Sequence, residues 1–202
     1  MNEHGTVGYT LHGNRYLNLG HRCTLRCAFC PKHNGVFTVK EYDLLLAREP
    51  TLDEVCEAVG NPADYRDLVF CGLGEPTIRL DVLLAVAERF HGKGARIRVN
   101  TDGLASLVHG RDVAPELAGK VDALSISMNA QDEETYVRHC RPSRPGAYEA
   151  MKAFAKRAKE FVPEVTLTAI DGLPGVDVEA CRRIAENELG VQFRRRTLDD
   201  VG

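Results

Sequence analysis

Cys23-Thr24-Leu25-Arg26-Cys27-Ala28-Phe29-Cys30 brings three cysteines into a C-x3-C-x2-C spacing. The stretch follows directly on a strand-like run, residues 15–20. A compact loop of this kind can turn three thiolates toward one centre, and soft thiolates select iron–sulfur clusters, zinc or copper(I). The spacing therefore predicts a metal centre just beyond the end of this strand.

The remaining cysteines help to choose between these centres. Cys56, Cys71, Cys140 and Cys181 stand singly, and the chain has no second C-x2-C or H-x3-H pair. A structural zinc ion normally takes its four ligands from such pairs. A [4Fe–4S] cluster usually takes four thiolates, so three would leave one iron open to a small molecule. The spacing favours the cluster, with a zinc site or three structural cysteines as the alternatives.

Around this loop, apolar runs typical of buried strands alternate with helical patterns. The strands are predicted to start near residues 15, 67, 96, 123, 165 and 191. The helices are predicted over residues 51–59, 80–91, 114–118, 147–161 and 178–189, and a capping box of Thr51 and Glu54 opens the first of them. Such alternation indicates βαβ units and a parallel sheet.

The length of the chain limits the number of these units. A closed eight-unit barrel takes about 250 residues, or roughly 31 for each unit. The chain has 202 residues, so we expect one α/β domain, residues 1–202, forming an open six-stranded partial (β/α)6 TIM-like barrel. A short N-terminal hairpin strand, residues 6–11, precedes the first barrel strand. Residues 31–50 show no clear period and are interpreted as a loop over the site or as a surface excursion.

Composition narrows the class of protein. The chain is 44% hydrophobic and 27% charged, with a net charge of −3, which gives no general attraction to nucleic acid or to an anionic membrane. No apolar run reaches the roughly 18 residues that span a bilayer, and the N-terminus does not resemble a signal peptide. The seven cysteines are odd in number and mostly isolated, unlike a secreted disulfide framework. We expect a cytoplasmic protein with no membrane partner and no clear nucleic-acid binding.

Unusual polar and glycine-rich motifs follow the predicted strands. Gly72-x-Gly74-Glu75-Pro76 follows the second strand, Asn100 begins the turn after the third, and Ser127-x-Asn129 ends the fourth. Ligands of parallel α/β folds gather at the carboxyl ends of the strands. Each motif alone has a plainer interpretation, a tight turn or a strand-end cap. Their agreement predicts one binding site along this edge of the sheet.

The cysteine spacing, the aromatic Phe29 before the third cysteine and the Gly-x-Gly-Glu-Pro motif together resemble the radical S-adenosylmethionine (SAM) enzymes. The resemblance runs from Tyr16 to about Arg195 and implies a [4Fe–4S] cluster held by Cys23, Cys27 and Cys30, with SAM as the second cofactor.

The same resemblance assigns roles to the strand-end residues. The backbone at Gly72 and Gly74 would contact the amino group of SAM, and glycine would be needed because a Cβ would hold the ligand away. Glu75 is placed with this motif, where it is expected to order the turn.

Further cofactor contacts are expected from polar strand ends and from the aromatic side chain of the loop. Ser127 and Asn129, two residues apart and therefore predicted to share one strand face, would bind ribose hydroxyls. Phe29 would stack near the adenine. Asn100 and Thr168 are further candidates, and Arg141 or Arg144 would pair with the SAM carboxylate unless they are simply solvated.

Three longer stretches resemble a narrower group, the TatD-nuclease-associated radical SAM proteins. They are Tyr-Leu-Asn-Leu at residues 16–19, Cys-Gly-Leu-Gly-Glu-Pro-Thr at 71–77 and Leu-Ser-Ile-Ser-Met-Asn-Ala at 124–130. The chain itself has no HxH pair or clustered metal set of a nuclease among its seven histidines.

The resemblance implies a reaction. An external one-electron reductant of the flavodoxin or ferredoxin type would reduce the cluster, and cleavage of SAM would give a 5′-deoxyadenosyl radical that abstracts hydrogen from an unidentified substrate. The alternatives are an activase that installs a glycyl radical on a partner protein and a non-catalytic iron–sulfur module for electron transfer or sensing. The chain is not expected to hold an auxiliary-cluster domain, because it ends close after its sixth strand.

Cys140 is the catalytic candidate outside the cofactor motifs. It lies between His139 and Arg141, with Arg138 nearby, and is predicted in a loop on the catalytic side of the sheet. Cationic neighbours lower the pKa of a thiol. We expect Cys140 either to return a hydrogen atom to a substrate radical or to be a buried bystander.

Overall fold

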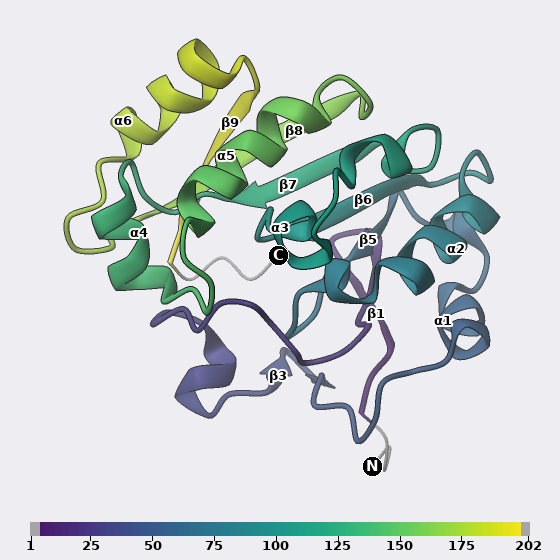
Figure 1. The fold of residues 1–202 in the computed structure, drawn as a ribbon. Coiled ribbons are helices and arrows are strands. Elements are labelled where there is room, and N and C mark those ends of the chain that lie inside the picture. The colour runs from purple at the N-terminus through teal and green to yellow at the C-terminus, as the bar shows by residue number, and fades with distance from the viewer. Residues whose placement is uncertain (1–4, 199–202) are drawn as a thin grey trace.

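The protein, analysed as a computed structural model whose residues 5–198 are described, has an α/β fold built on a mostly parallel sheet (Figure 1). The sheet has the order β1-β2-β5-β6-β7-β8-β9; β1 is antiparallel to β2, and every other neighbouring pair is parallel. The strands are β1 (Gly8–Leu11), β2 (Asn14–Leu17), β5 (Asp67–Phe70), β6 (Arg96–Thr101), β7 (Ala123–Ser127), β8 (Glu164–Asp171) and β9 (Gln192–Thr197). The α/β class and the mostly parallel sheet are thus confirmed.

The helices are α1 (Leu52–Val59), α2 (Leu80–Phe90), α3 (Ala105–His109), α4 (Glu133–Cys140), α5 (Ala147–Ala158) and α6 (Val178–Arg183). The chain continues from α6 as a π-helix, Ile184–Leu189, within the single helix predicted there. The helix predicted over 114–118 is a 3-10 turn, Ala114–Leu117. The sequence did not predict α3 or α4.

Helix α4 was missed because its sequence is mostly polar and carries little apolar periodicity. Its start is set by Asp132, whose Oδ1 accepts a hydrogen bond from the backbone N–H of Thr135 at 2.7 Å. An Asp at this position satisfies one of the otherwise unbonded first-turn N–H groups. Burial of Tyr136 and Cys140, both 0% exposed, holds the helix against the core.

The two faces of the sheet pack against different layers. Leu68 and Phe70 of β5 belong to the main core, which they share with the helices, whereas Val69 between them packs with Tyr16 of β2 in a second, smaller cluster. Successive strand side chains point to opposite faces. We call the face that carries Tyr16 and Val69 the inner face. Figure 1 shows α2, α3 and α5 across the other face.

Residues 31–50 cover part of the inner face. They contain a 3-10 turn (Pro31–Asn34) and a small hairpin of β3 (Thr38–Val39) and β4 (Tyr42–Asp43). Val39 and Leu44 are buried in the same cluster as Tyr16. The interpretation of residues 31–50 as a simple surface excursion is therefore wrong, because the segment packs against the sheet.

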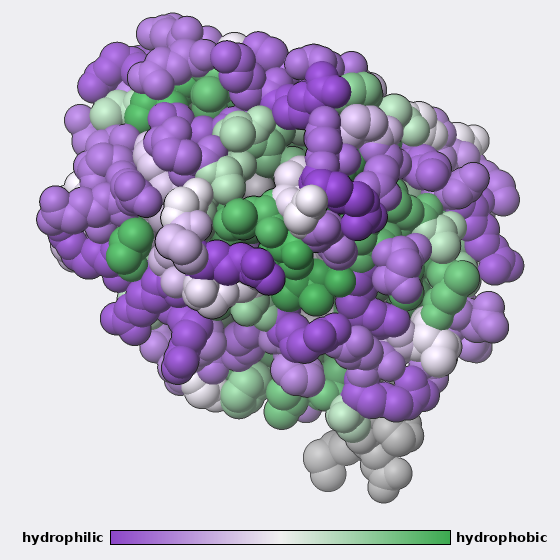
Figure 2. Space-filling view, viewed as in Figure 1, coloured by the Kyte–Doolittle hydropathy of each residue, from purple (hydrophilic) through white to green (hydrophobic). Residues whose placement is uncertain are grey.

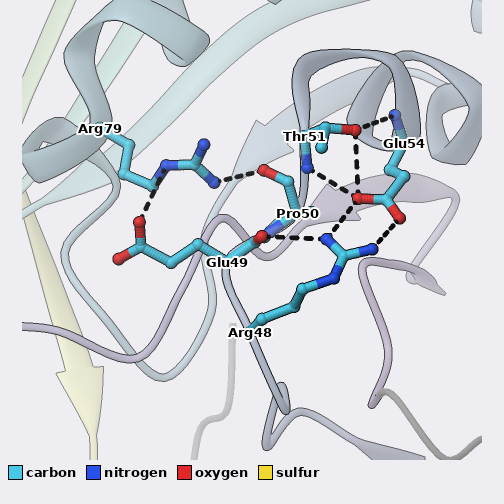
Figure 3. A network of polar contacts seen from close by, with 6 residues as sticks. All are labelled: Arg48, Glu49, Pro50, Thr51, Glu54 and Arg79. Carbon is cyan, nitrogen blue, oxygen red and sulfur yellow. Dashed lines mark hydrogen bonds and ion pairs between the residues drawn. The ribbon is translucent and has the colours of Figure 1, made fainter.

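The end of this segment is tied to α1 and to Arg79 by a network of polar contacts (Figure 3). Thr51 and Glu54 form the predicted capping box, which is confirmed. Arg79 donates hydrogen bonds to the carbonyl oxygens of Pro50 at 2.6 Å and Leu19 at 3.1 Å. One arginine thus joins the chain before the cysteine loop to the chain before α1.

Within the described part of the chain, no helix is both long and apolar enough to cross a membrane. Figure 2 shows hydrophobic side chains gathered toward the middle of the viewed face, with hydrophilic ones around them.

Candidate functional site

The three cysteines of the 23–30 loop are thiols outside any disulfide. Cys23 is exposed, and Cys27 and Cys30 are partly exposed. The loop turns on itself, because the N–H of Cys30 donates to the carbonyl oxygen of Cys27 at 3.1 Å. The N–H of Leu25 points at the sulfur of Cys23 at 3.4 Å. Such N–H groups favour a thiolate over a thiol.

The C-terminus of α4 forms the platform on which the loop rests. The N–H of Arg26 donates to the carbonyl oxygen of Cys140 at 3.0 Å, and the N–H of Ala28 donates to that of His139 at 2.8 Å. These carbonyl groups at a helix end have no partner within the helix. The N–H groups of the loop act as their partners. The position of the loop is therefore fixed by α4, a helix that the sequence did not predict.

A buried carboxylate ties the loop to the sheet from the other side. The hydroxyl of Thr24, between the first two cysteines, donates to Oδ2 of Asp102, which follows β6. Oδ1 of Asp102 accepts a hydrogen bond from the N–H of Leu104 at 2.9 Å. Asp102 is 6% exposed, and desolvation raises the pKa of its carboxyl group. These donors offset part of the cost of burying the charge.

Glu75 links Asp102 to the glycine-rich motif. Its Oε1 accepts hydrogen bonds from the N–H of Thr77 at 3.0 Å and the hydroxyl of Thr101 at 2.8 Å. Its Oε2 accepts one from the N–H of Asp102 at 2.7 Å. Desolvation, followed by the nearby charge of Asp102, raises the pKa of Glu75. Because the two buried carboxyl groups disfavour double ionisation, a proton shared between them is the favoured state. The expected turn-ordering role of Glu75 agrees with these contacts.

Glycine is required at positions 72 and 74 because neighbouring segments of the chain leave no room for a Cβ atom. A Cβ on Gly72 would meet the side-chain oxygen of Asn18. A Cβ on Gly74 would lie 2.5 Å from the carbonyl oxygen of Gly20 and 2.6 Å from that of Arg22. The sequence interpretation attributed these glycines to the approach of a ligand. The structure shows that they also let the motif pack against the chain that enters the cysteine loop.

The prediction that Cys140 lies in a loop among cationic neighbours is wrong. Cys140 is the last residue of α4 and is 0% exposed. Arg138 pairs with Glu134 at 3.1 Å, and Nε2 of His139 lies 2.8 Å from the carbonyl oxygen of Pro174. These neighbours have other partners because they lie on a helix, where adjacent side chains point in different directions.

The Cys140 thiol contacts the cysteine loop directly. It is hydrogen-bonded to the thiol of Cys27, and this contact, followed by desolvation, raises the pKa of Cys27. Nδ2 of Asn129 approaches the sulfur of Cys140 at 3.9 Å. Cys27, Cys140 and Asn129 therefore form one contact group beneath the loop.

Two buried polar atoms near these thiols have no hydrogen-bond partner among residues 5–198. They are the hydroxyl of Tyr136, which is 0% exposed, and Oδ1 of Asn129, which is 2% exposed. Desolvation raises the pKa of Tyr136, as do the neighbouring Cys140, Asp102, Cys27 and Cys23, in that order. A buried polar group without a partner costs about 1–3 kcal/mol. A polar group bound at the cysteines would relieve this cost, so the surroundings fit a cofactor there.

Within residues 5–198, no three His, Cys, Asp or Glu side chains gather closely enough to hold a single metal ion. A four-iron cluster binds each thiolate at a separate iron. The donor set of three thiolates on one loop therefore suits a cluster, and its residues would be Cys23, Cys27 and Cys30.

The strand-end candidates are only partly brought together. Ser127 pairs in register with Thr168, and Asn100 pairs with Ser125, so these side chains share the inner face. The strand alternation used to predict that Asn129 shares this face with Ser127 does not apply to Asn129. β7 ends at Ser127, and Asn129 adopts a left-handed backbone with φ of 60°. Strand alternation does not extend beyond the strand.

The remaining candidates lie at the edge of this site. The side chain of Phe29 is half-buried and packs against the main core. Arg141 is exposed and caps α4 in a left-handed conformation, and Arg144 is exposed in the following loop.

The sequence did not single out Thr24, Asp102 or Tyr136. Asp102 lies in the turn that follows Asn100, and Thr24 lies inside the quoted cysteine stretch. A signal for α4 was also present, since Asp132 stands three residues before Thr135 and is followed by two glutamates. This pattern is typical of a helix N-terminus.

Known proteins of similar sequence and fold were found for this chain. GTP 3',8-cyclase of Rhodococcus opacus (strain B4) is 25% identical over 144 residues, which cover 69% of this chain and 39% of the cyclase. A structure of TYW1 with a bound lysine-pyruvate adduct superposes with a TM-score of 0.65 at 16% identity, covering 94% of this chain and 66% of that one. SuiB of Streptococcus suis bound to S-adenosylmethionine gives a TM-score of 0.64 at 15% identity, covering 92% of this chain and 38% of SuiB.

These structural likenesses show a shared fold. The chain spans well under half of the length of the cyclase it resembles. The family model described as the radical SAM superfamily matches residues 17–187, most of the chain, including all three loop cysteines. The chain therefore belongs to the radical SAM superfamily, whose enzymes use a [4Fe–4S] cluster and S-adenosylmethionine.

Proposed function

We propose that this chain is a radical SAM enzyme that removes a hydrogen atom from a substrate yet to be identified. The observation that carries the proposal is the placing of the 23–30 loop. It lies on the end of α4, joined to the glycine-rich motif by Asp102 and Glu75, with the unpartnered hydroxyl of Tyr136 close to its thiols. When bound, the cluster and SAM supply a carbon radical after transfer of one electron.

The chain's own residues hold and orient these groups. Cys23, Cys27 and Cys30 would bind the cluster, and the backbone of the 72–75 motif would contact the amino group of SAM. Ser127, Thr168 and Asn100 offer hydroxyl and amide groups along the inner face for the rest of that molecule. Asn129 would use its unpartnered oxygen, and Phe29 would lie near the adenine.

The proposed role of Cys140 as a hydrogen-atom donor requires the thiol to reach a substrate radical. Its full burial and its contact with Cys27 favour the alternative, in which the thiol is structural. Cys140→Ser separates the two. A donor would be needed to complete product but not to cleave SAM, whereas a structural thiol would leave the product rate at that of the parent.

The proposal also covers the barrel, the cellular location, the electron donor and the subgroup of the protein. The sheet is proposed to form an open partial barrel within one radical SAM core domain, in a cytoplasmic protein that receives electrons from a flavodoxin or ferredoxin. We further propose that the chain is a member of the TatD-nuclease-associated radical SAM proteins. The motifs at residues 16–19, 71–77 and 124–130 support this assignment.

Two other functions fit fewer of the observations. A glycyl-radical activase would use the same loop but act on a partner protein. A module for electron transfer or sensing would need the cysteine loop and no ordered strand ends. Thr24 and Asp102 join the cysteine loop to Glu75 of the glycine-rich motif by hydrogen bonds. Binding of a cluster alone would not require these hydrogen bonds.

The proposal is tested by anaerobic reconstitution followed by reduction with dithionite in the presence of SAM. We expect about four irons and matching sulfide per chain, and formation of 5′-deoxyadenosine. Cys23→Ala, Cys27→Ala and Cys30→Ala should each abolish both, whereas Cys56→Ala, in α1, should retain both. One zinc ion without sulfide would overturn the cluster assignment. A cluster with no SAM cleavage would favour the electron-transfer module.

A further inference from the structure

The loop that carries the three cysteines lies at the surface of the molecule. Between the cysteines, Arg26 and Ala28 are exposed, whereas Leu25 packs into the main core. Electron transfer slows steeply as the distance between two redox centres grows, so a donor has to approach a centre from its nearest surface. Electrons for a cluster at this loop would therefore enter through the surface around Arg26 and Ala28.

The chain around this loop is basic. Residues 21–40 contain no aspartate or glutamate, and their lysines and arginines are Arg22, Arg26, Lys32 and Lys40. In the whole chain the balance is reversed, with 29 acidic and 26 basic residues. The positive charge is therefore local to this region and is not a property of the whole chain.

The end of α4 adds two exposed arginines, Arg141 and Arg144, beside the loop. The N–H of the residue before Arg144 donates to the carbonyl oxygen of Thr24 at 3.0 Å. The N–H of Arg26 donates to the carbonyl oxygen of the residue before Arg141, also at 3.0 Å. Figure 1 shows α4 and the purple segment that includes the loop on the same side of the molecule. Backbone contacts thus place the three arginines around one surface.

The chain does not neutralise these three arginines. Among residues 5–198, the side chains of Arg26, Arg141 and Arg144 make no ion pair, hydrogen bond or ring contact. The carboxylate of Glu49, which reaches this region, is paired with Arg22 at 2.7 Å. Uncompensated positive charges on one surface attract an anionic partner and speed its association.

Exposed apolar side chains lie among these charges. Val36 and Val137 are each 47% exposed. Val36 follows the 3-10 turn that begins directly after Cys30. Val137 lies one helical turn before Arg141, whose N–H donates to the Val137 carbonyl oxygen at 3.0 Å. Apolar contacts within a polar rim are typical of protein–protein interfaces.

We propose that the surface formed by Arg26, Val36, Val137, Arg141 and Arg144 docks an acidic one-electron donor protein of the flavodoxin or ferredoxin class. The inference rests on the proposed function, in which such a donor reduces the cluster, and it adds where the donor binds and through which charges. In each encounter the donor loses one electron and the cluster gains it, with no bond formed or broken. Encounters between redox partners bury less than about 1,200 Å² and are guided by complementary charge.

Nucleic acid is the other anionic macromolecule that a basic surface attracts. Domains that bind it typically have a pI above about 9, whereas the pI of this chain is about 6.2. The basic residues also surround the cysteine loop instead of lining a groove or one face of a helix. Both observations favour a redox partner.

The test follows reduction of the oxidised cluster in the reconstituted protein by stopped-flow absorbance, with photoreduced flavodoxin as the donor. Arg26→Gln should lower the second-order rate constant at low salt by about two- to fivefold, because charges at the rim of an interface act mainly on association. Arg26→Lys keeps the charge and should restore most of the rate. Added salt screens exposed charges, so it should slow the parent more than Arg26→Gln.

Arg89→Gln is the matched control for charge. Arg89 is an exposed arginine near the end of α2, toward the amino ends of the strands and therefore at the opposite end of the sheet from the cysteine loop. Its variant should be reduced by flavodoxin as fast as the parent. A photogenerated deazaflavin radical, a small donor that needs no docking surface, should reduce the parent, Arg26→Gln and Arg89→Gln equally fast.

The other half of the surface is tested with Val137, Arg141 and Arg144. Val137→Ser should raise the flavodoxin concentration at half-maximal rate and keep the salt dependence of the parent, because salt does not screen apolar contacts. Arg141 and Arg144 are also candidates for binding the SAM carboxylate, so Arg141→Gln and Arg144→Gln are titrated with SAM as well. Slower reduction by flavodoxin at the parental SAM affinity supports docking, whereas a loss of SAM affinity removes that arginine from the docking surface.

Equal rates for Arg26→Gln and Arg89→Gln at every salt concentration would overturn the proposal, even in a protein that cleaves SAM with dithionite. An equally large loss with the deazaflavin radical would overturn it too, because the defect would then lie in the cluster. Binding of a single-stranded RNA oligonucleotide that Arg26→Gln weakens, with no effect on reduction by flavodoxin, would assign the surface to nucleic acid. Charge-dependent reduction by flavodoxin in a protein that cleaves no SAM would refute the proposed function and leave the docking surface standing.

Discussion

The hydroxyl of Thr24 donates a hydrogen bond to the buried carboxylate of Asp102, and this contact joins the cysteine loop to the end of β6. The two residues are far apart in the sequence, and each has a local role as well. Thr24 lies between the first two cysteines, and the N–H of Asp102 donates a hydrogen bond to Glu75 of the glycine-rich motif. The contact makes the geometry of the loop depend on the strand ends that are proposed to hold SAM.

Thr24→Val should therefore destabilise the protein even without a cofactor. The substitution keeps the shape of the side chain but leaves Asp102 short of one donor, at a cost of about 1–3 kcal/mol. Urea unfolding of the cluster-free protein measures the change. Thr38→Val, at an exposed position of β3, is the control and should have little effect. Equal stability of the two variants would show that the contact contributes nothing.

Glu75 should make stability fall as the pH rises. Its folded-state pKa is raised by desolvation and by Asp102, so above its ordinary value of about 4.5 the folded state binds more protons than the unfolded state. Stability is then lost as the pH rises from that value toward the folded pKa, at up to about 1.4 kcal/mol per pH unit. Unfolding of the cluster-free protein across this range should show the slope, and Glu75→Gln should flatten it. Glu57→Gln, on the exposed side of α1, should leave the slope unchanged.

Tyr136→Phe should reveal whether a bound group satisfies the buried hydroxyl. In the cluster-free protein the variant should be as stable as the parent or more stable, by about 1 kcal/mol, because it removes a buried polar group without a partner. If the loaded site provides a partner, the advantage should disappear after reconstitution. Tyr148→Phe is a close control: its hydroxyl is also buried without a partner, but desolvation and Cys181 are the main influences on its pKa. The same response in both variants would exclude a specific role for Tyr136.

Gly74→Ala should disturb the cluster loop as well as SAM binding. The added Cβ would lie within 2.6 Å of two carbonyl oxygens of the chain that enters the loop, so the backbone must move, at a cost of about 1–3 kcal/mol. Lower iron content after reconstitution, together with weaker SAM binding, is the expected result. Gly20→Ala, whose Cβ would meet only ordinary contacts at 3.6 Å and beyond, should behave like the parent. Full iron content in Gly74→Ala would restrict the role of this glycine to SAM.

Local patterns were enough to predict much of this protein. The spacing of Cys23, Cys27 and Cys30, the capping box of Thr51 and Glu54, and the apolar runs of the parallel strands all act over a few residues. Thiolate chemistry, helix capping and strand burial depend on such short spacings. They determined the expected cluster ligands and the mostly parallel α/β fold.

The tertiary structure decided what surrounds those ligands. The sequence could not show that α4 ends beneath the loop or that the Cys140 thiol contacts Cys27. These relations join segments far apart in the chain, and each depends on strand register and on how the helices pack. No periodicity along the sequence encodes such distances, because they arise only when the whole sheet and its helices are assembled.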